Sequence, residues 1–204
     1  MKIRIYYYAI LTLTFSATLL VSCGRHTTIS EKTSFTHIDS LTDTYLTLQD
    51  TLLHSWNVLL KEEHEKMQAM EKVMEHLLHS PTADPSQVAA LGARLDQLHQ
   101  LNITTKTLAN QYVVEEHDVA AQAVTHDLLT MAESNSALLM NKEFTQLVAR
   151  IKSADQRTWQ HRSGYDSIAH LFNNFLEKNK NLLTDIEKSG SLEKRPTFNE
   201  VTGK

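Results

Sequence analysis

The chain has 204 residues, of which 41% are hydrophobic and 22% charged, and its formal net charge is −4. This length predicts one domain with additional segments, and the lack of a basic excess argues against a nucleic-acid-binding protein. Only 5 glycines and 3 prolines are present. That composition favours long helices over a β-sandwich or β-barrel.

Residues 1–22 have the layout of a secretory signal peptide. Lys2 and Arg4 form a short positive segment, residues 5–21 are uncharged and mostly apolar, and Ser22 precedes the only cysteine, Cys23. The last four of these residues, Leu-Val-Ser-Cys, resemble a bacterial lipobox. This resemblance implies cleavage before Cys23 and acylation of that residue, and two or more acyl chains hold a protein stably on a membrane. An uncleaved transmembrane anchor is the alternative, and both place the following domain outside the cytoplasm.

A polar segment, residues 23–35, has no helical period and is predicted to be a tether. Thr36 and Asp39 then have the spacing of a capping box. Apolar residues recur every three or four positions from Ile38 to Leu77, which predicts an amphipathic helix that ends near His79.

Three further helices are predicted in the remainder of a bundle domain that spans residues 36–188. Asp84-Pro85 marks the start of the second helix. The third covers about 108–133, with Tyr112, Val119, Ala123, Leu128 and Met131 as the apolar residues along it, and the fourth begins near Asn141 and extends to Ile186. Gly164 within the fourth helix suggests a close approach of a neighbouring helix. Residues 189–204 carry Gly, Pro and charge without period and are predicted to be a disordered tail. The expected fold is therefore all-α, an antiparallel up-down four-helix bundle.

The last two predicted helices carry a pattern that resembles the LemA family, without a gap from Glu133 to Asn173. The matching residues are Leu138, Asn141, Phe144, Leu147, Ile151, Asp155, Gln156, Arg157, Arg162, Tyr165, Ile168, Phe172 and Asn173. The first helix agrees more loosely, through Trp56, Met70, Val73, Met74 and Leu77. It departs from the family where Glu63-His64-Glu65 and Glu71-Lys72 replace paired arginines and a Pro-Asn. The resemblance implies a membrane-anchored, extracytoplasmic four-helix bundle whose activity is not settled.

Polar residues interrupt the apolar face of the last helix. Asp155, Arg157, Arg162 and Tyr165 are predicted to form a structural polar network, because a buried arginine needs an acidic partner. Glu115, Glu116 and Asp118 are the candidate partners on another helix. A polar ligand pocket inside the bundle is the alternative.

The histidines and methionines of the first helix suggest a second kind of site. Met67, Met70 and Met74, with His64 one turn before them, have soft-ligand chemistry suited to Cu(I). The same spacing is that of a core-facing stripe, which is the favoured interpretation. The eleven histidines form no HExxH or Glu-x-x-His pattern, so no metal and no cofactor is predicted.

The sequence lacks a glycine-rich phosphate loop, a nucleophile elbow and a Ser/His/Asp pattern, and we expect no enzymatic activity. The predicted function is that of a lipid-anchored scaffold or interaction module of the bacterial cell envelope. Its expected partners are membrane lipid, through acylated Cys23, and an unidentified envelope protein. Gly24 stands where an aspartate signals inner-membrane retention in some bacteria, so a periplasm-facing position on the outer membrane is favoured. The alternative function is a periplasmic bundle that binds a metal or a small ligand.

Overall fold

The computed structural model describes residues 36–186 and 192–199, and only the backbone of residues 185 and 186. The predicted signal peptide and tether therefore lie outside the described residues. The fold is all-α, as predicted, and the described ranges contain no strand. The elements are α2 (His37–Leu78), α3 (Pro85–Gln100), a 3-10 helix η1 (Thr107–Ala109), α4 (Gln111–Ser134), α5 (Ser136–Leu139) and α6 (Lys142–Ile186).

Side-chain caps start most of these helices. Thr36 and Asp39 form the predicted capping box, in which each side chain accepts a hydrogen bond from the other residue's backbone N–H. Asp84 caps α3 by accepting from the N–H of Ser86, with Pro85 at the first helical position. Asn110 caps α4 in the same way. These caps satisfy backbone donors that have no partner within the helix.

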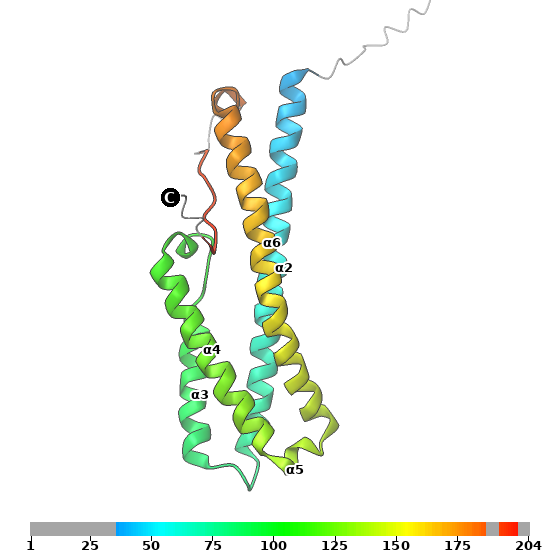
Figure 1. Ribbon diagram of the computed structural model, residues 1–204, viewed down its shortest axis with the longest axis vertical. Helices are drawn as coiled ribbons and strands as arrows, with labels where there is room; N and C mark the ends of the chain where they lie inside the picture. Colours follow the sequence, from blue (N-terminus) through cyan, green and yellow to red (C-terminus); the bar gives the residue numbers. More distant parts are fainter. Residues whose placement is uncertain (1–35, 187–191, 200–204) are drawn as a thin grey trace, which may run out of the picture. The chain divides into compact units, whose positions relative to one another are not determined.

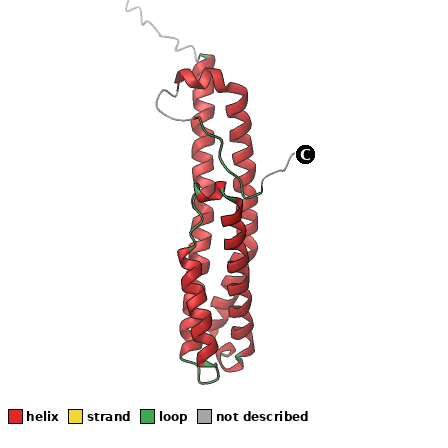
Figure 2. Ribbon diagram, turned by 90° about the vertical axis from the view of Figure 1, so that its left-hand side faces the viewer, coloured by secondary structure: helices red, strands yellow, loops and turns green. Residues whose placement is uncertain are grey.

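The two longest helices, α2 and α6, pack along each other in antiparallel directions (Figures 1 and 2). Tyr45 near the start of α2 stacks on Phe172 near the end of α6, with ring centroids 5.9 Å apart. Further along, Trp56 contacts Tyr165 at 5.3 Å. Met70, nearer the end of α2, shares a cluster with Ile151 from the first half of α6. Each helix, about 65 Å long, thus contributes apolar side chains to the contact along most of its length.

Four helices share the core only in its largest cluster, beside the α2–α3 turn. That cluster joins Met70, Leu91, Leu128 and Phe144 from α2, α3, α4 and α6. A second cluster around Trp56 adds η1 and the C-terminal segment, and a third is built almost wholly by α2 and α6. α3 and α4 therefore cover only part of the α2–α6 pair, as Figure 1 shows.

Several expectations were wrong for α4 and the segment before it. Leu108 is buried in η1, and α4 begins only at Gln111. Tyr112 and Val119, expected on the apolar face, are 83% and 64% exposed. The face that meets the core carries Val114, Val124 and Leu128, of which Leu128 was predicted correctly.

Gly164 does not mark a close helix contact. A Cβ atom placed there would meet nothing within 4 Å. Glycine in the interior of a helix is less favourable than alanine by about 1 kcal/mol, and no contact of the described residues offsets that cost at this position.

The C-terminal segment, residues 192–199, differs from the predicted disordered tail. It runs back along α6 without helix or strand (Figure 2). Thr197 and Phe198 are 7% and 5% exposed. Asp166 and Asn173 of α6 hydrogen-bond to the segment, which fixes a stretch whose composition alone predicts disorder. The rest of that tail lies outside the described residues.

No helix within residues 36–186 and 192–199 combines the length and apolar character needed to span a membrane.

Candidate functional site

Two interhelical ion pairs join the middle of α2 to α6. Lys66 Nζ lies 2.5 Å from Asp155 Oδ1, and the Lys66 side chain is only 7% exposed. One turn earlier on α2, Glu62 accepts a hydrogen bond from Arg157 Nε at 2.9 Å. The pair with the higher residue number on α2 has the lower residue number on α6, so both pairs fit one antiparallel register. They therefore stabilise this register against sliding of the two apolar faces.

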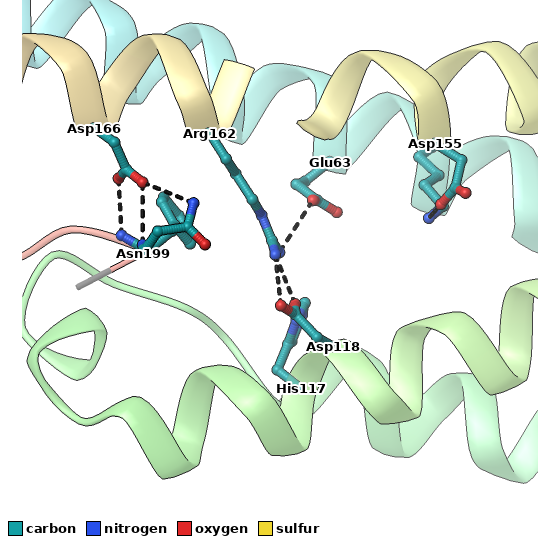
Figure 3. A network of polar contacts seen from close by, with 9 residues as sticks. Glu63, His117, Asp118, Asp155, Arg162, Asp166 and Asn199 are labelled. Carbon is teal, nitrogen blue, oxygen red and sulfur yellow. Dashed lines mark hydrogen bonds and ion pairs between the residues drawn. The ribbon is translucent and has the colours of Figure 1, made fainter. Parts of the chain in front are cut away.

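Arg162 forms the centre of a separate, more buried group (Figure 3). Its Nη1 donates to both carboxylate oxygens of Asp118 at 2.7 Å, and its Nη2 lies 3.9 Å from Glu63 Oε1. The Arg162 guanidinium carbon is also 4.7 Å from the ring centroid of Phe198. Asp118 is thus the partner chosen among the three predicted candidates, and Arg162 links α2, α4, α6 and the C-terminal segment.

Asp118 is held in its charged form. Burial disfavours the carboxylate, but hydrogen bonds from His117 and Arg162, together with the charge of Arg162, outweigh burial and lower the pKa of Asp118 below its ordinary 3.8. The ion pair with Arg162 is therefore present at neutral pH. His117 Nδ1 lies 3.4 Å from Asp118 Oδ1, which places one titratable ring directly beside this pair.

Tyr165 does not join the ion pairs. Its hydroxyl is buried and has no hydrogen-bond partner among the described residues. Burial raises the pKa of Tyr165 to about 12. The ring packs between Trp56 and Phe198, with centroids 5.3 and 5.9 Å away. The four residues predicted as one network thus divide into three distinct ion pairs and one aromatic core residue.

A cavity of about 170 Å³ opens beside Arg162. Apolar side chains form most of its wall, and charged and imidazole groups lie along one part. Its lining includes Trp56, Leu60, Glu63, His64, Met67, Leu98, His99, Ile103, His117, Ala121, Arg162 and Phe198. Arg162 Nε is buried and lacks a hydrogen-bond partner among the described residues. A mostly apolar cavity with a few charged and imidazole groups along one part has the chemistry of a small-ligand site.

The C-terminal segment supplies functional residues that the sequence did not reveal. Asp166 accepts hydrogen bonds from the backbone N–H groups of Phe198 and Asn199 at 2.8 and 3.1 Å, and from Asn199 Nδ2 at 3.1 Å (Figure 3). Asn173 exchanges two hydrogen bonds with the backbone of Arg195. Phe198 is the only aromatic residue after Phe175, and that isolated aromatic was the one available signal.

The methionine stripe of α2 lies in the core. Met70 and Met74 are 0% and 6% exposed, and Met67 packs against the same cluster. His64 contacts Gln68 rather than a methionine sulfur. The part of the chain that the structure describes contains no group of three or more His, Cys, Asp or Glu residues placed to hold a metal ion. Cys23 lies outside the described residues.

No protein-family model, no curated protein and no solved structure matches the chain. The LemA resemblance therefore stays a prediction.

Proposed function

We propose that the chain is a lipid-anchored, non-enzymatic helical module of the bacterial cell envelope that binds another protein. The main support for the lipid anchor is the Leu-Val-Ser-Cys box that ends at Cys23. It directly follows a short positive segment and an apolar run. Support for an interaction role comes from exposed apolar side chains on the helices, among them Trp159 at 72% and Leu171 at 60% exposure. The LemA resemblance agrees with this role, but the proposal does not depend on it.

Replacing Cys23 with alanine is expected to abolish lipid attachment. Cells that express the chain are fed a radiolabelled or alkyne-labelled palmitate, and label on the protein and its presence in the membrane fraction are measured. The wild-type chain should carry label. Cys23→Ala should carry none and should run as the uncleaved precursor, because the acyl acceptor and the cleavage signal are the same residue.

Ser22→Ala serves as the matched control, since it keeps a small residue before the cysteine and should keep the label. Label retained on Cys23→Ala, or an unprocessed wild-type chain free in the cytosol, would disprove the anchor.

A small-ligand-binding bundle is the second candidate, and the cavity beside Arg162 is the observation that favours it. An apolar molecule with one polar group matches the apolar wall and the charged and imidazole residues of the lining. Native mass spectrometry of the chain purified from cells should show a bound small molecule that disappears in Ala121→Leu, where added side-chain volume fills the cavity. A wild-type spectrum without any bound mass would remove this candidate.

A further inference from the structure

Two side chains on one face of α6 hold the C-terminal segment by its main chain. Asp166 and Asn173 are seven residues apart, which is two helical turns. Asn173 donates to the carbonyl of Arg195 at 2.8 Å and accepts from its N–H at 2.7 Å. Asp166 accepts from the backbone N–H groups of Phe198 and Asn199. Hydrogen bonds to backbone groups bind an extended chain and depend little on the identity of its side chains.

A single aromatic socket adds selectivity to this backbone binding. Phe198 stacks on Trp56 with centroids 6.1 Å apart and an interplanar angle of 20°, and it meets the edge of Tyr165 at 80°. Arg162 lies over the same ring. The socket is therefore built by α2 and α6 and accepts a flat aromatic side chain.

The charged side chains of the segment lie at the surface. Glu193, Lys194 and Arg195 are exposed, and the ion pair of Lys194 with Glu177 joins side chains that are 65% and 68% exposed. Release of residues 192–199 breaks no helix, and the rings of Trp56 and Tyr165 that it uncovers would be covered again by a phenylalanine of the partner. Such terminal segments open at a small part of the global unfolding free energy.

We propose that the surface formed by Trp56, Tyr165, Asp166 and Asn173 is a peptide-binding site for an extended segment of a partner protein. The partner segment carries a phenylalanine, and the backbone N–H groups of this phenylalanine and of the next residue donate to Asp166. Residues 192–199 occupy the site until the partner displaces them. This inference names the kind of partner for the interaction module proposed above, and it rests on that role but not on the lipid anchor.

A second copy of the chain is a poorer occupant than a partner protein. Its segment is identical to residues 192–199, and the attached segment competes at an effective concentration of about 1 mM. An identical segment in trans gains an advantage only above that concentration. A partner segment with additional contacts can displace the attached segment at lower concentrations.

A labelled synthetic peptide of residues 192–199 tests the site in the full chain. In Phe198→Ala the attached segment loses its anchor, so this variant should bind the peptide with a Kd of roughly 10–100 μM by fluorescence anisotropy. The wild-type chain should bind about tenfold or more weakly, because its own segment competes. Adding Asp166→Ala to the Phe198→Ala variant, or replacing phenylalanine in the peptide with alanine, should weaken binding at least tenfold.

Circular dichroism controls for folding, and a chain that ends at Ser191 replaces Phe198→Ala if that variant is unfolded. Absence of peptide binding by a folded variant, equal binding by wild type, or no effect of Asp166→Ala would overturn the site. A wild-type dimer at micromolar concentration that dissociates when peptide is added would assign the site to a second copy and overturn the partner assignment. Loss of the palmitate label would disprove the anchor alone, whereas failed peptide binding would disprove this site and leave the anchor intact.

Discussion

Replacing Phe144 with alanine is expected to lower the free energy of unfolding by about 3–5 kcal/mol. Phe144 is fully buried in the one cluster to which α2, α3, α4 and α6 all contribute. The ring of His76 meets it edge-on, at 5.6 Å between centroids and 83° between planes. Four helices surround the site, so they cannot all close on the space left by the ring. The cost therefore includes a cavity as well as lost burial.

Urea denaturation followed by circular dichroism at 222 nm measures this loss. Phe175→Ala is the matched control, because it makes the same change on the same helix at a side chain that is only partly buried. It should cost less than half as much. Equal losses for the two variants would show that the four-helix cluster is not the most tightly packed part of the chain.

Local signals in the sequence predicted α2 and its core face correctly. The capping box at Thr36 and apolar residues at every third or fourth position are local properties, and Leu41, Trp56, Met70 and Leu77 are buried as expected. The same reasoning failed for α4. Val119 and Leu128 are nine residues apart, which is two and a half helical turns, so they lie on opposite sides of α4. Leu128 meets the core, and Tyr112 and Val119 were placed on the wrong side.

The partners of the charged residues depended on information that is not local. An acidic partner for Arg162 followed from the cost of an unpaired buried charge, but three acids on one helix met that condition. The choice of Asp118 depends on how α4 is rotated against α6, which the packing of Val114, Val124 and Leu128 determines. Lys66 and Glu62, on a charged stretch of α2, offered no signal that distinguished them from solvent-exposed residues.

The C-terminal segment could not be predicted because its attachment is mainly through backbone groups. Residues 192–199 are rich in charge and contain a proline, a composition typical of disorder. Hydrogen bonds from Asp166 and Asn173 to the main chain leave no pattern in the segment they hold. Only the lone aromatic, Phe198, was a signal in the sequence, and its position against α6 emerges from the fold.

Arg162→Met is expected to destabilise the chain by about 2 kcal/mol, because it leaves Asp118 partly buried without its cation. The side chains of Arg162 and Asp118 are 16% and 34% exposed, so the loss is smaller than for a fully buried pair. Arg94→Met is the matched control. Arg94 and Asp127 lie at a similar distance, 2.6 Å, but are 43% and 46% exposed, and solvent-exposed pairs contribute about 0–1 kcal/mol.

The dependence of this pair on pH separates its charge from its packing. Because the folded-state pKa of Asp118 is lowered, its stabilising contribution is present above about pH 4 and is lost as pH falls through that lowered pKa. The stability difference between wild type and Asp118→Asn should therefore still be present at about pH 5 and shrink toward pH 3. Urea midpoints measured across this range for wild type, each single variant and the double variant give the coupling energy, which should be about 1–2 kcal/mol at pH 7. If the coupling energy does not decrease at acidic pH, packing and hydrogen bonding rather than opposite charges stabilise the contact. The ion pair would then not be the reason that Arg162 holds the four segments together.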